Sequence, residues 1–194
     1  MRVLLLIVIV FTFSYCAQTE DKNTSTTINK LISADTTSTP ENTVLSFLKW
    51  YKDNGQGIAN DLVLNIGIKD RDSTKFYSVN FQATENYLKK LKETSSISDK
   101  YVNKWREYFR KCDQHFKNNP TNEGPPVGFD YEFITLSQDD PGLSVLEKAN
   151  LSVIKRDKNS SIVLIQFPST YQYNYYLTKQ GAHWQIDDIE YIAK

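Results

Sequence analysis

The side chains best suited to chemistry lie in one segment, residues 129–141, where acids stand beside aromatic residues. Asp130, Tyr131 and Asp139 offer a carboxylate next to a phenol, a pair that can move a proton at a bound substrate. Gln138 adds an amide that both donates and accepts hydrogen bonds. Acids in such segments also commonly cap backbone N–H groups at turns, and we favour that interpretation of Asp130 and Asp139.

A row of aromatic residues near the C-terminus offers a surface on which a sugar or an aromatic ligand could stack. Tyr171, Tyr173 and Tyr175 share one face of an expected strand, and Trp184 lies on the next strand. Such a row is more often the inner face of a sheet that meets helical aromatics, and we favour that interpretation. Tyr173 and Trp184 are nevertheless candidate ligand residues, together with the four residues of the segment 129–141.

Two further patterns point to nucleophilic or metal chemistry but have simpler interpretations. Cys112 and His115 share one expected helix, yet Cys112 falls within an apolar stripe and the chain has only two histidines and two cysteines. We therefore expect a buried thiol and no metal site or cofactor. Asp70 and Asp72 supply too few oxygen ligands for a calcium loop, so we expect a solvated turn there.

The overall charge gives no reason to expect nucleic acid as a partner. The 194 residues include 23 basic and 23 acidic side chains, and the formal net charge is zero. The basic residues are interspersed with acids, which is typical of solvated helix faces. A hydrophobic fraction of 40 % fits one globular domain.

Residues 1–16 have the pattern of a secretory signal, in which Arg2 precedes nine apolar residues. A membrane-spanning helix needs about 20 apolar residues, so this run is too short to span a bilayer. Cys16, followed by Ala17-Gln18, resembles the lipobox of bacterial lipoproteins, in which that cysteine is acylated, although Tyr15 is bulkier than the small residue usual before it. We predict a lipid anchor on Cys16 in the cell envelope, on the periplasmic or outer face. Ordinary cleavage after Cys16 or Ala17, giving a soluble periplasmic or secreted chain, is the alternative.

The rest of the chain divides into a polar segment and one domain. Ten of the 23 residues in 17–39 are serine or threonine, which predicts a flexible tether. From Pro40 onward the periodicity predicts one helix to about residue 54, a hairpin of 62–68 with 75–81, and helices at 83–94 and 98–118. Four strands follow, separated by turns at 157–159, 168–169 and 180–181. Helices followed by an antiparallel meander predict an α+β domain over residues 40–194, with the helices packed on one face of the sheet.

Several segments of this domain resemble a family of bacterial envelope lipoproteins known as domain of unknown function 3828. They are the helix at 44–51, residues 87–109, the run 124–131 followed by Gln138-Asp139, and the ending His183-Trp184-Gln185-Ile186-Asp187-Asp188-Ile189-Glu190-Tyr191-Ile192. The resemblance implies a cystatin-like cone, similar to nuclear transport factor two, in which helices close over a strongly curved sheet and leave a cavity. It implies no catalytic residues.

Three functions are consistent with the sequence. We prefer a non-enzymatic, lipid-anchored envelope module that binds a small ligand or another envelope protein. The second is an enzyme that uses Asp130, Tyr131 and Asp139 in a cone cavity, which requires these side chains to converge in an apolar pocket. The third is a periplasmic immunity or inhibitor protein, which requires a large exposed aromatic or charged patch.

Overall fold

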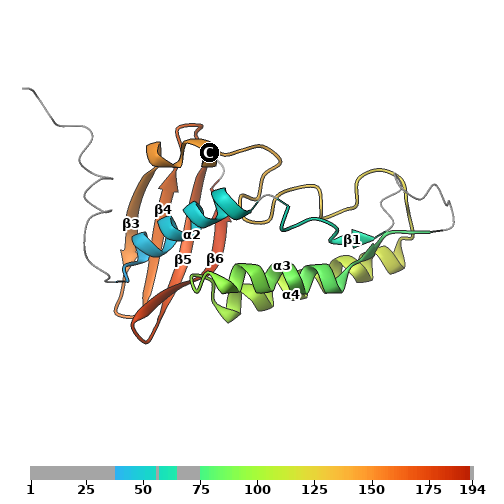
Figure 1. The fold of residues 1–194 in the computed structure, drawn as a ribbon, viewed down its shortest axis with the longest axis horizontal. Coiled ribbons are helices and arrows are strands. Elements are labelled where there is room, and N and C mark those ends of the chain that lie inside the picture. The colour runs from blue at the N-terminus through green and yellow to red at the C-terminus, as the bar shows by residue number, and fades with distance from the viewer. Residues whose placement is uncertain (1–37, 56, 65–74, 193–194) are drawn as a thin grey trace, which may run out of the picture. The chain divides into compact units, whose positions relative to one another are not determined.

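The computed structural model describes residues 38–55, 57–64 and 75–192 (Figure 1). Its helices and strands belong to the compact unit Asp35–Lys194. The expected signal with Cys16, most of the Ser/Thr-rich segment and the turn with Asp70 and Asp72 lie outside the described residues. Within the described part of the chain, no helix combines the length and the apolar character needed to cross a bilayer.

Helices come first along the chain and a four-stranded sheet comes last. The helices are α2 (Pro40–Asn54), α3 (Phe81–Glu93), α4 (Asp99–Asn118) and the short 3-10 helix η1 (Leu143–Lys148). The strands are β1 (Val63–Leu64), β2 (Ser78–Val79), β3 (Asn150–Arg156), β4 (Ser160–Gln166), β5 (Gln172–Gln180) and β6 (His183–Tyr191). Strands β3 to β6 are antiparallel neighbours in chain order, so the predicted α+β class and meander are confirmed.

Side-chain caps set the start of each long helix. The Thr39 hydroxyl accepts from Asn42 N ahead of α2, and the Ser98 hydroxyl accepts from Tyr101 N ahead of α4. The predicted limits of these two helices are confirmed to within a residue. Helix α3 begins at Phe81 because Asn80 caps it, so the prediction that Phe81 ends a strand was wrong.

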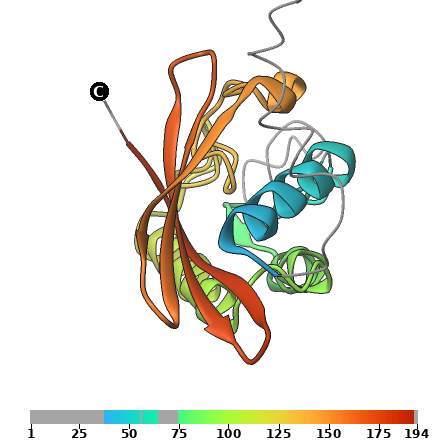
Figure 2. The same cartoon turned by 90° about the vertical axis from the view of Figure 1, so that its left-hand side faces the viewer.

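The sheet buries the face that carries the tyrosine row. Tyr173 pairs with Ile165 and Tyr175 with Val163, and all four side chains are buried. Helix α2 lies across this face (Figure 2), and it buries Phe47, Leu48 and Tyr51 there. The tyrosine row is therefore the inner face of the sheet, as we favoured, and Tyr173 and Tyr175 do not form an exposed stacking surface.

A separate two-stranded ladder pairs β1 with β2, where Val63 lies opposite Val79. The predicted hairpin is thus confirmed where its two strands pair, and its turn lies outside the described residues.

The aromatic stripe of α4 is covered as expected. Phe133 from the following loop contacts the rings of Trp105 and Phe109, at 5.0 and 5.4 Å between centroids.

Candidate functional site

Two adjoining hollows lie between residues 57–63 and the loop of residues 129–144, at the end of α2. They have volumes of about 550 and 810 Å³, a size suited to a small ligand. We call the two together the loop cleft. The residues that line both hollows are Ala59, Asn60, Glu132, Ser137 and Gln138.

Glu132 lies at the centre of the loop cleft and is fully engaged with protein donors. Its Oε1 accepts a hydrogen bond from the Tyr51 hydroxyl, which comes from α2. Its Oε2 accepts from the backbone N–H groups of Ile134 at 2.8 Å and Thr135 at 3.1 Å. Burial, and then the Glu132 carboxylate, raise the pKa of Tyr51 far above its ordinary value, so this phenol stays protonated and donates. Glu132 therefore shapes the loop and joins it to α2.

The loop is held by its own turns and by anchors in the core. Glu132 N donates to Ser137 O at 2.9 Å, and between them Leu136 adopts a left-handed backbone with φ 49°. Phe133 and Ile134 are buried, and the Tyr173 hydroxyl donates to Thr135 O at 2.6 Å. The lining of the cleft is therefore set before any ligand binds, which lowers the entropic cost of binding.

Gly128 starts the loop in a conformation that favours glycine. Its φ is +84°, and an added Cβ would lie 2.7 Å from the Tyr108 hydroxyl oxygen and 3.0 Å from Cys112 Sγ. The Tyr108 hydroxyl donates to Gly128 O at 2.9 Å, so helix α4 fixes the point at which the chain enters the loop.

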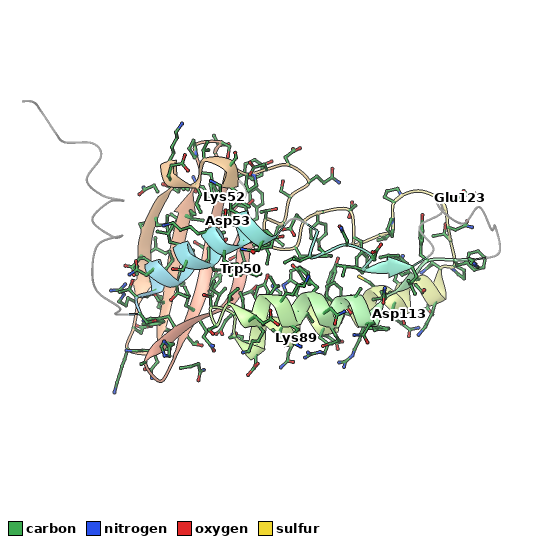
Figure 3. The ribbon with its side chains drawn as sticks, in the orientation of Figure 1. Trp50, Lys52, Asp53, Lys89, Asp113 and Glu123 are labelled. Carbon is green, nitrogen blue, oxygen red and sulfur yellow. The ribbon has the colours of Figure 1, made fainter. Side chains whose placement is uncertain are left out.

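The loop cleft carries an excess of negative charge although the chain as a whole is neutral. Among the described residues, its acidic lining residues are Asp61, Asp130, Glu132, Asp139 and Asp140, and its one basic lining residue is Lys52. Lys52 lies near the C-terminal end of α2 (Figure 3), donates to Ser144 O at 3.2 Å and lies 3.9 Å from Glu147. Five acids facing one partly neutralised lysine favour a positively charged occupant.

Asp140 is used within the protein as a cap. Its carboxylate accepts from the backbone N–H groups of Gly142, Leu143 and Ser144 at 2.9, 2.7 and 3.2 Å. Burial alone would raise the pKa of Asp140, but these hydrogen bonds outweigh it and hold the pKa below its ordinary value. The carboxylate is therefore charged at neutral pH.

Asp130 and Asp139 are exposed, and their carboxylates make no hydrogen bond or ion pair with the described residues. The prediction that these two acids cap backbone N–H groups was therefore wrong. Glu132, two residues after Asp130, and Asp140, one residue after Asp139, do the capping instead. Two carboxylates are thus left free on the wall of the cleft.

The structure brings four of the six predicted ligand residues together. Asp130, Tyr131 and Gln138 line the first hollow, and Gln138 and Asp139 line the second. Tyr173 and Trp184 are buried elsewhere, and neither lines the loop cleft.

Among the residues of the enzyme hypothesis, the structure pairs neither carboxylate with the phenol of Tyr131. The Tyr131 hydroxyl donates to the Tyr108 hydroxyl at 2.9 Å, and that group in turn donates to Gly128 O. Asp130 and Asp139 are exposed on the wall of an open cleft. The arrangement can bind a polar ligand.

Cys112 is buried and free, as we predicted from its place in the apolar stripe. Burial raises the pKa of its thiol, which disfavours the reactive thiolate. His115 is exposed near the C-terminal end of α4. Among the described residues, no group of three or more histidine, cysteine, aspartate or glutamate side chains is placed to hold a metal ion.

Comparison of the chain with protein-family models, with curated proteins and with solved structures finds no match. The site is therefore interpreted from its own geometry, and the resemblance noted above stays a prediction.

Sequence reasoning missed Glu132, Asn60, Asp61 and Tyr51. Asn60 and Asp61 were part of a segment without periodicity, where Asp61 adopts a left-handed backbone with φ 58°. Tyr51 belonged to an apolar helix face and was assigned to the core. One weak signal pointed to Glu132, since a carboxylate two residues before buried backbone N–H groups is a common capping arrangement.

Proposed function

We propose that this chain is a non-enzymatic binding module and that the loop cleft binds a small ligand with a positive charge. One observation carries the proposal. Asp130 and Asp139 are exposed on the wall of a hollow and make no hydrogen bond or ion pair with the described residues. The described lining adds three further acids and one lysine. A cation entering the cleft would meet acceptors that need no rearrangement.

The strength expected from this charge is modest. An exposed ion pair contributes about 0–1 kcal/mol, so two free carboxylates alone support weak binding. The polar residues Asn60, Ser137 and Gln138 line the same cleft, and their side chains can add hydrogen bonds that orient the ligand. We therefore expect an affinity that depends strongly on salt concentration, because exposed charges are screened.

Among the described residues of the cleft, no free carboxylate is paired with a free phenol, which supports the non-enzymatic assignment. Glu132 has three donors on its two oxygens, and the Tyr131 phenol is held by Tyr108. Both groups are therefore engaged within the protein.

We also propose that the domain is exported and anchored in a bacterial envelope by a lipid on Cys16. The apolar run after Arg2, the cysteine that follows it and the Ser/Thr-rich segment 17–39 support this placement. We propose further that the domain is a variant of the cystatin-like cone of the lipoprotein family named above. Its antiparallel sheet with α2 across one face supports that assignment.

Backbone amide shifts in nuclear magnetic resonance test the binding proposal. Putrescine, a diamine, should shift amides of residues 57–63 and 129–144, whereas the uncharged butanediol of the same chain length should not. Equal shifts with both molecules, or putrescine shifts spread over the surface, would contradict the proposed charge recognition.

Mass spectrometry of the chain expressed in a bacterium tests the anchor. We expect a mature N-terminus at Cys16 that carries acyl groups, and loss of the membrane-associated fraction in a Cys16→Ser variant. A mature chain that begins at Ala17 or Gln18 without a lipid would refute the anchor and leave the binding proposal intact.

A further inference from the structure

A third hollow, of about 450 Å³, lies between α4 and the loop of residues 129–144, and we call it the α4 groove. Its lining residues on α4 run from Lys104 to Lys111 at steps of one, two and three, which place them on one side of the helix. Tyr131 is the one residue that the α4 groove shares with the described lining of the loop cleft. The groove is therefore a separate hollow.

The walls of the α4 groove are mainly aromatic and aliphatic. Trp105, Tyr108 and Tyr131 supply rings, and Leu136 supplies an aliphatic side chain. The ring centroids of Trp105 and Tyr108 lie 5.2 Å apart, edge to face, and the Tyr131 hydroxyl donates to the Tyr108 hydroxyl at 2.9 Å. Burial, and then the hydrogen bond with Tyr131, raise the pKa of Tyr108 far above its ordinary value, so this phenol adds no negative charge. These contacts hold the rings in place, so a flat apolar ligand could pack on them with little rearrangement.

The charged lining of the α4 groove leaves one cation without a partner. Glu107 lies 3.6 Å from Arg110, and Lys104 forms an ion pair with Asp188. The side chain of Lys111 is exposed and makes no hydrogen bond or ion pair with the described residues. An anion entering the groove would meet an ammonium group without first breaking an ion pair. This preference is opposite in sign to that of the acidic loop cleft.

We infer that the α4 groove binds a small aromatic ligand that carries a carboxylate. The aromatic ring of the ligand packs against the ring walls of the groove, and its carboxylate pairs with Lys111. Both parts are needed, because an exposed ion pair alone stabilises a complex only weakly and the burial of apolar surface supplies the rest. The inference does not depend on the proposed function, since it concerns a different hollow and a ligand of opposite charge.

Nuclear magnetic resonance of the full chain with three probe molecules tests the inference. Benzoate should shift the indole N–H signal of Trp105 and the backbone amides of residues 104–111, 131 and 136. Benzamide keeps the ring but not the charge, and it should bind about threefold to fivefold more weakly, as expected for the loss of one exposed ion pair. Acetate keeps the charge but not the ring, and it should leave these signals in place. Equal affinities for benzoate and benzamide, or equal shifts with acetate, would overturn the inference.

Two lysine variants show whether the charge acts at this groove. Lys111→Gln and Lys89→Gln each remove one positive charge from an exposed helical position, and Lys89 lies on α3 and does not line the groove (Figure 3). Lys111→Gln should lower the affinity for benzoate to that for benzamide, whereas Lys89→Gln should leave it unchanged. An unchanged benzoate affinity in Lys111→Gln, or an equal loss in both variants, would contradict recognition by Lys111.

Discussion

Replacing Glu132 by alanine should destabilise the domain far more than replacing a typical glutamate. The substitution removes the acceptor of the Tyr51 hydroxyl and of the N–H groups of Ile134 and Thr135. Tyr51, Ile134 and Thr135 are all buried, so these donors do not readily find water.

The expected magnitude follows from these three bonds. A buried donor that loses its partner costs about 1–3 kcal/mol, and Glu132 itself is half-buried, so water reaches part of the space that alanine leaves. We therefore expect a loss of about 2–4 kcal/mol in the free energy of unfolding, out of a total of about 5–15 kcal/mol for a domain of this kind. Glu132→Gln keeps one acceptor oxygen and should lose about half as much.

Equilibrium unfolding in guanidinium chloride measures this difference. Glu147→Ala is the matched control because Glu147 is 61 % exposed and lies 3.9 Å from Lys52. An exposed ion pair of this kind should contribute less than about 0.5 kcal/mol. If the free energy of unfolding of Glu132→Ala differs from that of the wild type by less than about 0.5 kcal/mol, Glu132 does not hold the loop to α2. The cleft would then not be a preformed site.

Three further predictions concern the loop of residues 129–144, the glycine before it, and helix α4. Gly128→Ala should lower the free energy of unfolding by more than about 2 kcal/mol, because the strain of a positive φ adds to the close approach of the new Cβ to Tyr108. Gly124→Ala is the control, and it should lower the free energy of unfolding by about 1 kcal/mol, because Gly124 has φ +72° but open space around its Cβ. Equal losses in the two variants would show that Tyr108 moves aside at no cost. Hydrogen bonds lower the pKa of Asp140 below its ordinary 3.8, so the stability they give is present above that value and is lost as the pH falls through the lowered pKa. Asp140→Asn should therefore flatten the acid side of a stability profile between about pH 5 and 2, and an unchanged slope would contradict this. Cys112, in a Cys16→Ser background, should react with a thiol reagent much more slowly in the folded than in the unfolded chain, and equal rates would show that its burial is only transient.

The fold was largely predictable because its signals are local. Helices α2 and α4 begin after a hydroxyl side chain, which precedes Pro40 in one and Asp99 in the other. The strands after Ala149 follow from a period-two pattern of apolar residues. Each of these signals comes from neighbours in the chain. The start of α3 was misplaced because Asn80 caps it, and an asparagine between two apolar residues looks equally suited to a turn.

The candidate site was less predictable because it depends on contacts between distant segments. Tyr51 and Glu132 are 81 residues apart, and no periodicity links them. The loop turns at Leu136 in a left-handed conformation that a leucine rarely adopts, so its sequence carries no sign of the turn. The net charge of zero likewise gave no indication that five acids would gather at one cleft.

The most direct test of the proposed function is the dissociation constant of putrescine for two variants that lose the same two charges. Asp130→Asn with Asp139→Asn removes the free carboxylates of the cleft, whereas Asp53→Asn with Glu123→Gln removes two acids that do not line it (Figure 3). Calorimetry or amide shift titration at low salt should show binding weakened about tenfold in the cleft variant, which corresponds to the loss of about 1.4 kcal/mol, and nearly unchanged in the control. Equal affinities in the two variants would contradict the claim that this cleft recognises a positively charged ligand.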